Sequence, residues 1–390
     1  MKNKKNILLV SQNFSLTGAP LVLYWLATFL KSEGHNVTVW GIKDGPLSQN
    51  LVEDGFDVEI VDSERRFIKN KFERSSHNFD LIICNTIVTY KFVDVLQRYE
   101  IPLVWYIHET KFLEDFVHDY QDCKVLLENF YNIYTVSEYA KSVIAKYNPN
   151  IKVIPNGVKD TFTHYSENSQ IFRFGFIGSI IQIKGIDLLV DSFIKLLENN
   201  KNISLTIAGQ FDSELGLKLR NKTENIKEIK WLGQVKGEDK DEFFENIDVL
   251  CVPSLDDPCP LTVLEGAMKG KVIITTTNVG SNYILKDLSL LIVNSGDLDA
   301  IHSIMNYLCL NRDKIQELQK QIRNNYLDLG TIERQEQAIR TLIQDNLCNY
   351  PVVRNMLSLE RISVFKKRKL LNKKREVYIL GKMIFSYRKR

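Results

Sequence analysis

Short apolar runs alternate with longer amphipathic segments along most of this 390-residue chain. The runs have the length of buried strands, and the segments between them carry apolar residues at helical spacing, as at Ile186, Leu189, Phe193 and Leu196. We expect strands at residues 7–10, 37–42, 58–61, 80–85, 103–107, 130–136, 151–154, 172–177, 203–208, 229–232, 247–252, 272–276 and 290–294. Strands that alternate with helices predict an α/β protein with parallel sheets.

The alternation is interrupted by a polar stretch without periodicity at residues 161–170. On each side of it, a strand, a glycine-containing loop and a helix begin the series, as in a doubly wound, Rossmann-like sheet. Two such domains are also the default expectation for a chain of this length. The predicted parts are an N-terminal domain, a C-terminal domain, a closing helix and a basic tail: residues 1–160, 161–330, 331–350 and 351–390.

The composition is that of a globular protein with a hydrophobic core, because 44% of the residues are hydrophobic and 25% are charged. The six cysteines show neither a CxxC pair nor metal-ligand spacing, so we expect buried thiols in a reducing compartment. The apolar run near the N-terminus is too short for a signal peptide, and no stretch has the length of a membrane-spanning helix. These features predict a cytoplasmic protein.

The net charge of +3 hides a basic tail. Residues 352–390 contain 13 Lys and Arg but 2 acids, a balance of 13 − 2 = +11, which leaves 3 − 11 = −8 for the rest. Because apolar residues are interspersed with these bases, we predict that the tail binds the anionic inner face of a bacterial membrane, as a peripheral attachment. Nucleic acid is the rival anion, but no nucleic-acid-binding motif accompanies the charge. A solvated tail, or a short hairpin around Gly381, also fits the composition.

The strongest chemical signal lies in residues 251–270. A buried strand leads into a loop with Asp257, and a short helix follows that holds Glu265, eight positions further on. A helix N-terminus attracts phosphate through its free N–H groups, here those of Leu261 and Thr262, and through its dipole. A carboxylate just behind it can accept hydrogen bonds from sugar hydroxyls. The spacing alone equally allows a loop acid and a solvated helix residue.

A second candidate loop opens the C-terminal domain. It runs from Gly178 to Gly185 and carries one cation, Lys184, just before a helix. Such a loop can wrap a diphosphate, although a solvated lysine fits the spacing as well. Gly209 ends the following strand.

Two positions in the N-terminal domain are also candidates. His108 directly follows a predicted strand, at the sheet edge where open α/β sheets bind ligands, and is either catalytic or structural. Gly18 lies in the loop after the first strand, where a small residue lets a ligand approach the backbone or merely makes the turn. This loop is not GxGxxG, so a dinucleotide cofactor is poorly supported.

The segment PSLDDPCPLTVLEGAMKGKVIITT, residues 253–276, resembles the hallmark segment of the retaining glycosyltransferases of family 4. The segment VIPNGV, residues 153–158, resembles the sequence near the hinge between their domains. The resemblance extends from about residue 5 to 346 through short motifs in the family's order. It implies the GT-B fold, in which two doubly wound domains face each other across a cleft and a closing helix crosses back to the first. It also implies a nucleotide diphosphate sugar as donor and retention at the anomeric carbon. We expect no metal, because a helix N-terminus with Lys184 can hold the diphosphate instead, and no cofactor.

The resemblance further implies residue roles. Glu265 would hold the nucleotide ribose, Asp257 would meet the donor sugar, and His108 would lie at the reacting face. The implied site residues are Gly178, Lys184, Gly209, Leu261, Thr262 and Glu265 for the donor, His108 and Asp257 for catalysis, and Gly18 for the acceptor side.

The sequence departs from the family pattern at three positions. Asp257 replaces the usual Glu, Pro260 replaces a Gly, and Ser179 replaces an Arg. We expect transfer to a growing glycan or lipid-linked acceptor in bacterial surface-polysaccharide synthesis, because residues 377–390 resemble closing segments of some such enzymes. A non-catalytic partner subunit with this fold and a nucleotide-sugar isomerase are the alternatives.

Overall fold

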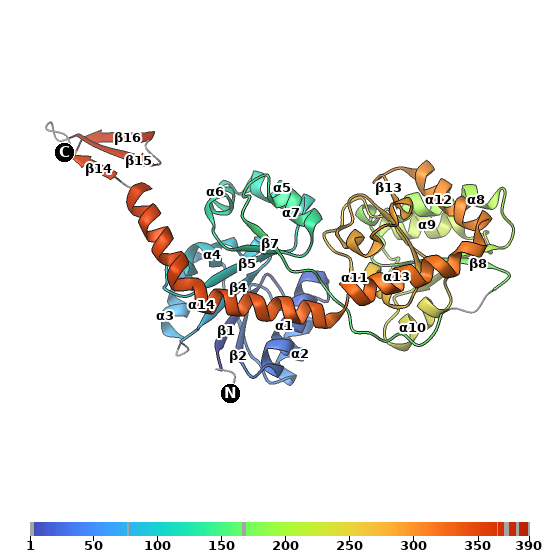
Figure 1. The fold of residues 1–390 in the computed structure, drawn as a ribbon, viewed down its shortest axis with the longest axis horizontal. Helices are drawn as coiled ribbons and strands as arrows, with labels where there is room; N and C mark the ends of the chain where they lie inside the picture. The colour runs from blue at the N-terminus through green and yellow to red at the C-terminus, as the bar shows by residue number, and fades with distance from the viewer. Residues whose placement is uncertain are drawn as a thin grey trace.

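The structure is a computed structural model that describes residues 4–75, 78–165, 169–364, 366–369, 374–379 and 382–388, with side chains described as far as Cys348. Figure 1 shows two α/β domains side by side along the long axis of the molecule. Each domain is built on one parallel sheet with helices on both faces. The predicted fold class is therefore confirmed.

The N-terminal sheet has seven parallel strands in the order β3-β2-β1-β4-β5-β6-β7. Its strands are β1 (Asn6–Ser11), β2 (Asn36–Gly41), β3 (Asp57–Ile60), β4 (Leu81–Asn85), β5 (Leu103–Ile107), β6 (Ile133–Thr135) and β7 (Ile151–Val153). Its helices are α1 (Gly18–Ser32), α2 (Pro46–Glu53), α3 (Arg65–Arg74), α4 (Tyr90–Leu96), α5 (Lys111–Asp119), α6 (Gln121–Asn129) and α7 (Glu138–Ile144). Successive residues of β1 serve opposite faces: Ile7 and Leu9 pack with α1 and α2, whereas Leu8 and Val10 pack with α3 and α4.

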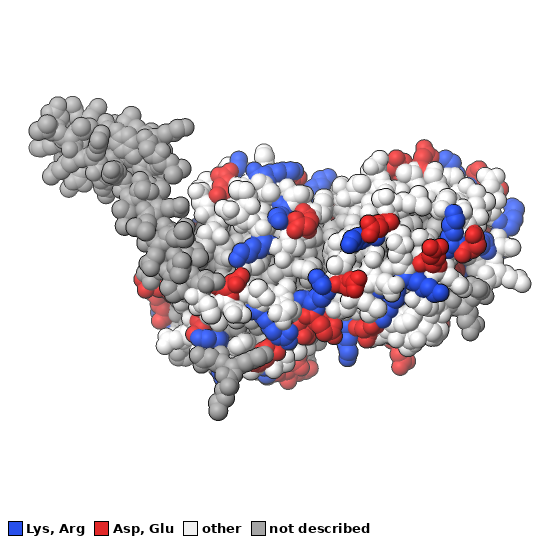
Figure 2. All heavy atoms as spheres, viewed as in Figure 1, with Lys and Arg blue, Asp and Glu red and all other residues white. Residues whose placement is uncertain are grey.

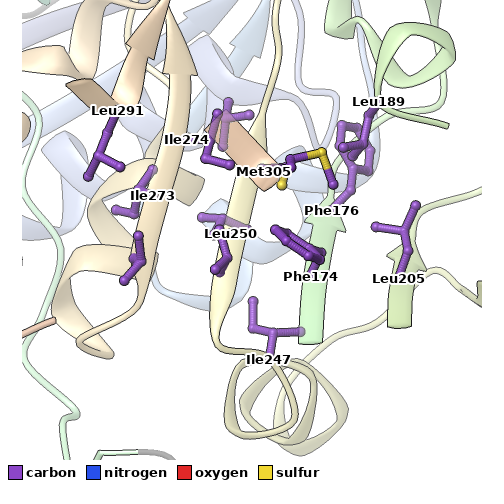
Figure 3. Packing of buried hydrophobic residues seen from close by; sticks show 14 of the residues in the cluster. Phe174, Phe176, Leu189, Leu205, Ile247, Leu250, Ile273, Ile274, Leu291 and Met305 are labelled. Atoms are coloured by element: carbon purple, nitrogen blue, oxygen red, sulfur yellow. The ribbon is translucent and has the colours of Figure 1, made fainter. Parts of the chain in front are cut away.

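The C-terminal sheet has six parallel strands in the order β10-β9-β8-β11-β12-β13. Its strands are β8 (Phe172–Ile177), β9 (Ile203–Ala208), β10 (Ile229–Gly233), β11 (Val249–Val252), β12 (Val272–Thr276) and β13 (Ile292–Val293). Its helices are α8 (Ile186–Leu197), α9 (Glu214–Thr223), α10 (Glu238–Glu245), α11 (Leu261–Met268), α12 (Leu298–Leu310) and α13 (Ile315–Leu329). Figure 3 shows Phe174, Leu205, Leu250 and Ile274 on the sheet with Met305 of α12 packed among them.

A closing helix, α14 (Ile332–Val364), returns to the N-terminal domain. Ile339, Leu342 and Ile343 are buried in the core cluster of that domain. The Arg340 guanidinium lies 3.3 Å from the Glu33 carboxylate. The crossing helix was predicted to end within residues 331–350, and it continues to Val364 instead.

After α14 the chain forms a three-stranded antiparallel sheet of β14 (Lys366–Lys369), β15 (Lys374–Ile379) and β16 (Lys382–Arg388). The prediction that the basic residues of 352–390 contact a membrane concerns side chains outside the described residues. Among the residues that the structure describes, no helix combines the length and the apolar character needed to cross a membrane.

Charged side chains of both signs are interspersed over the face of the two domains shown in Figure 2. Five of the six cysteines, all except Cys348, are buried as free thiols. Helix α10 begins at Glu238 and ends at Glu245. It starts directly after Gly237, and Glu238, Asp239 and Asp241 lie in its first turn, where acids complement the helix dipole.

Two separate features of the backbone require a glycine at position 185, directly before α8. Gly185 has a φ of 65°, and a Cβ placed there would lie 2.0 Å from the carbonyl oxygen of Pro253. Gly34, directly after the C-terminal end of α1, has a φ of 90°, but a Cβ there would meet nothing within 4 Å. The two positions therefore share the backbone strain, and Gly185 alone adds a clash between the β8–α8 loop and the β11–α11 loop.

We expect Gly34→Ala to lower the free energy of unfolding by about 1 kcal/mol, from the left-handed backbone alone. Gly185→Ala should lower it by about 2–4 kcal/mol, because a forced shift of packed backbone is added. Urea denaturation of both variants measures the difference. Equal losses would show that the two loops do not need their close approach.

Candidate active site

His108 lies at the carboxyl end of β5 and is buried. Its Nε2 is 2.6 Å from Oδ1 of Asn85, and the Asn85 amide group donates to the carbonyl oxygen of Ala19. Because that second bond orients the amide with its oxygen toward the ring, Nε2 is the protonated nitrogen and Nδ1 carries the lone pair. Burial lowers the pKa of His108 to about 3, so the imidazole is uncharged at neutral pH.

Glu109, the next residue, is a partly buried acid at the same sheet edge. One carboxylate oxygen accepts hydrogen bonds from the backbone N–H groups of Ile87 and His108, both at 3.0 Å. Burial raises the pKa of Glu109 to about 7, although these N–H groups oppose the shift. Beside it, Thr86 has a φ of 77°, unusual for a β-branched residue, and its buried hydroxyl has no hydrogen-bond partner among the described residues. Backbone strain of this kind is often found at functional sites.

Lys184 and Asp257, predicted from separate motifs, form an ion pair in the C-terminal domain. The ammonium group of Lys184 lies 2.5 Å from the Asp257 carboxylate. Asp257 is buried, which raises its pKa, and the positive charge of Lys184 opposes that shift. The pair joins the β8–α8 loop to the β11–α11 loop, so both predicted donor-binding loops lie at one place.

Glu265 lies on α11 and pairs with Lys240 of α10 at 2.6 Å through one carboxylate oxygen. Its other oxygen, Oε2, is buried and has no hydrogen-bond partner among the described residues. A buried charged oxygen without a partner is costly, so this atom is available to a ligand hydroxyl. Leu261 and Thr262 are the first two residues of α11, after Pro260, where backbone N–H groups have no intrahelical acceptor.

The predicted glycines lie at three loops. Gly178 and Gly209 follow β8 and β9, and a Cβ on Gly209 would lie 2.1 Å from the carbonyl oxygen of Gly178. Gly18 is the exposed first residue of α1, and a Cβ there would meet nothing within 4 Å. Gly209 is thus needed for packing, whereas the protein itself does not require a glycine at position 18.

One carboxylate connects the two domains. Asp256, in the β11–α11 loop, accepts hydrogen bonds from the hydroxyls of Thr110 and Tyr139, each at 2.6 Å. Next to it, the hydroxyl of Ser137 donates to the carbonyl oxygen of Pro258 at 2.5 Å. The loops at the carboxyl ends of β5, β6 and β11 therefore meet, and the predicted residues of both domains lie around this junction.

Sequence reasoning missed several residues of the site: Asn85, Asp256, Thr110, Tyr139 and Lys240 are all engaged with predicted residues or their neighbours. Asn85 had a usable signal, since it ends a predicted strand next to that of His108. Asp256 stood in the recognised loop beside Asp257. Nothing local distinguishes Tyr139 or Lys240 from ordinary helix residues.

A cavity of about 560 Å³ adjoins this region between the domains. It is lined by Leu21, Val22 and Trp25 of α1, by residues 156–159, by Leu261, and by the first turn of α14. Its walls combine apolar side chains with Glu333, Glu336 and Lys159. No group of three or more His, Cys, Asp or Glu side chains suited to a metal ion occurs among the described residues.

Solved structures share this architecture. HepE from Anabaena, solved in complex with UDP-glucose, is 17% identical with a TM-score of 0.72, and the match covers 87% of this chain and 100% of that one. A glycosyltransferase from Rickettsia africae is 15% identical with a TM-score of 0.72, over 89% of this chain and 100% of that one. At these identities the likeness shows the fold, which is GT-B.

Two family models match the sequence. The model described as glycosyl-transferase family 4 matches residues 3–170, and the model described as glycosyl transferases group 1 matches residues 160–326. Together they span both domains, and the chain belongs to glycosyltransferase family 4.

Curated relatives match over shorter stretches. An uncharacterised glycosyltransferase from Methanocaldococcus jannaschii is 28% identical over 171 residues, which are 42% of this chain and 45% of the relative. Glycogen synthase from Mycoplasma mobile is 26% identical over 115 residues, 29% of this chain and 24% of that protein. The chain thus spans less than half the length of these relatives.

The raised pKa of Glu109 leads to a prediction for stability. Because its folded-state pKa lies above the ordinary value of 4.5, protonation favours the folded state below about pH 4.5, and this contribution is lost as the pH rises to about 7. Glu109→Gln keeps the shape of the protonated side chain. Relative to wild type, the variant should gain stability between pH 5 and pH 8, by at most about 3 kcal/mol, since the side chain is partly exposed.

The measurement is urea denaturation at both pH values, with Glu317→Gln at an exposed site of α13 as the control. The control should show the same difference from wild type at pH 5 and pH 8. A Glu109→Gln variant that behaves like this control would mean that Glu109 is already ionised at pH 5.

Proposed function

We propose that the protein is a retaining, metal-independent glycosyltransferase that moves a sugar from a nucleotide diphosphate sugar to a growing glycan or a lipid-linked acceptor. The observation that carries the proposal is the junction at Asp256, where the loop after His108 in one domain meets the loop that holds Asp257 and precedes α11 in the other. Bacterial surface-polysaccharide synthesis is the proposed setting.

The C-terminal domain would hold the donor. The ammonium group of Lys184 and the N–H groups of Leu261 and Thr262 would neutralise the diphosphate. Lys184 would turn from Asp257 to the phosphate, which frees the Asp257 carboxylate to accept hydrogen bonds from the donor sugar. The unpartnered Oε2 of Glu265 would accept a ribose hydroxyl.

The N-terminal domain would hold the acceptor and the reacting face. An uncharged His108, orientated by Asn85, would accept a hydrogen bond at Nδ1 from a sugar hydroxyl rather than act as a cation. The cavity beside α1, which begins at Gly18, is the proposed place of the acceptor. In the transfer, the bond from the anomeric carbon to the diphosphate breaks, a bond to the acceptor oxygen forms on the same face, and the acceptor proton leaves with the diphosphate.

The structure of HepE with UDP-glucose supports a nucleotide sugar as the donor class. The first experiment is therefore a screen of nucleotide sugars, beginning with UDP-glucose, for protection against thermal unfolding. With a donor found, Lys184→Ala and Glu265→Ala should each weaken its binding by about 10- to 100-fold, the cost of one charge-assisted hydrogen bond. His108→Ala should keep the thermal shift and lose transfer and donor hydrolysis. Wild type should keep its transfer activity when EDTA is present.

Lys218→Ala, at an exposed site of α9, is the control and should bind the donor as wild type does. Unchanged binding in both donor-site variants would remove the assignment of the diphosphate and ribose contacts. Binding without turnover by wild type would favour a non-catalytic partner subunit. A rearranged nucleotide sugar formed without acceptor would favour an isomerase.

A membrane-bound acceptor fits the charge of the tail, +11 over residues 352–390. Each base near an anionic surface contributes about 1 kcal/mol, so this number is ample for peripheral attachment at the cytoplasmic face. We predict that the full chain sediments with phosphatidylglycerol vesicles at low salt, whereas a chain ending at Val364 does not.

Phosphatidylcholine vesicles should bind neither form, and the shortened chain should keep its thermal shift with the donor, which shows that both domains are folded. Equal binding of the two forms to anionic vesicles would contradict the role of the tail and favour a soluble acceptor.

A further inference from the structure

The hydrogen bonds of Asp256 cross the domain boundary. Its carboxylate is 8% exposed and belongs to the β11–α11 loop of the C-terminal domain. Within the described part of the chain, the three groups that donate hydrogen bonds to it come from the N-terminal domain: the hydroxyls of Thr110 and Tyr139, and the backbone N–H of Lys111 at 3.3 Å. A buried carboxylate with these donors is a charge-assisted contact, and it exists only while the domains are together.

This carboxylate also completes a helix of the other domain. Lys111 is the first residue of α5, and the cap residue Thr110 makes no side-chain capping bond of its own. Asp256 accepts from the Lys111 N–H instead, so it caps α5 from outside, where a negative charge also complements the helix dipole. Helix α5 begins at Lys111, three positions after His108.

The same loop is held in the C-terminal domain by the residue that follows. Asp257 pairs with Lys184, its N–H donates to the carbonyl oxygen of Asn278, and its own carbonyl oxygen accepts from Gly280. Adjacent carboxylates therefore face different domains. Asp256 fixes the loop to the helix that follows His108, and Asp257 fixes it to the donor-binding loop.

We propose that Asp256 is a positioning residue that latches the two domains in the catalytic arrangement, with Thr110 and Tyr139 as its partners. The inference rests on the proposed function for its effect on turnover. The residues proposed to bind the donor all belong to the C-terminal domain. Losing the latch should therefore leave donor binding intact and lower the fraction of molecules in which His108 meets the bound sugar.

The test compares Asp256→Ala, Asp256→Asn and Tyr139→Phe with Asp313→Ala, an exposed aspartate on the surface of the C-terminal domain. Turnover should fall about 100-fold in Asp256→Ala and about 10-fold in Tyr139→Phe, with Asp256→Asn between wild type and Asp256→Ala, because an amide oxygen retains one acceptor. The dissociation constant of the donor should stay within about threefold of wild type. The double variant Asp256→Ala/Tyr139→Phe should be no slower than Asp256→Ala, since the two residues form one contact.

Small-angle scattering supplies a readout independent of catalysis. Without ligand, the radius of gyration should increase in Asp256→Ala and Tyr139→Phe but not in Asp313→Ala. Tyr139→Phe removes one hydroxyl only, so it tests the latch even if Asp256→Ala does not fold. Wild-type turnover in these variants, an unchanged radius, or a loss of donor binding equal to the loss of turnover would each overturn the proposal. If wild type itself shows no turnover, the proposed function is contradicted. The scattering result would still show whether Asp256 holds the two domains together.

Discussion

The two halves of the candidate site meet at the buried carboxylate of Asp256 in the C-terminal domain, which binds Thr110, Lys111 and Tyr139 of the N-terminal domain, with the Ser137–Pro258 hydrogen bond beside it. Each parallel sheet brings its own loops together at its carboxyl edge. The fold of one sheet does not determine where the carboxyl edge of the other domain's sheet lies. A charge removed from water needs nearly all its hydrogen bonds satisfied, so this contact tolerates little displacement and can define one relative position of the domains.

The two sides of the junction differ in their electrostatics. On the N-terminal side, burial keeps His108 uncharged and raises the pKa of Glu109 to about 7. On the C-terminal side, the charges of Lys184, Asp257, Lys240 and Glu265 are arranged in ion pairs. A diphosphate is a charged ligand and a sugar hydroxyl is not, so the proposed division of labour follows the charge on each side. Two groups on the C-terminal side remain available to a ligand: the unpartnered carboxylate oxygen Oε2 of Glu265, which can accept a hydrogen bond, and the backbone N–H groups at the N-terminus of α11, which can donate one.

Close backbone packing holds neighbouring loops of the C-terminal domain against one another. A Cβ on Gly185 would meet the carbonyl oxygen of Pro253, and a Cβ on Gly209 would meet that of Gly178. These contacts join loops that follow different strands of one sheet. Helix α14 adds a covalent return path, because Ile339 and Leu342 are buried in the core of the N-terminal domain. The domains are thus joined by two crossings of the chain as well as by Asp256.

Local sequence patterns were sufficient to predict the alternation of strands and helices, the division into two α/β domains, and the segments that carry Asp257, Lys184 and Glu265. These follow from local periodicity and from residues whose spacing carries a motif, which depend on neighbours a few positions away. The folded arrangement was needed to see that Asp256 binds Thr110, that Lys240 binds Glu265, that Asn85 orients His108, and that α14 continues to Val364. Thr110 and Asp256 are 146 positions apart. Local pattern reports whether a residue is buried, whereas its partner depends on how two separately folded sheets are placed against each other.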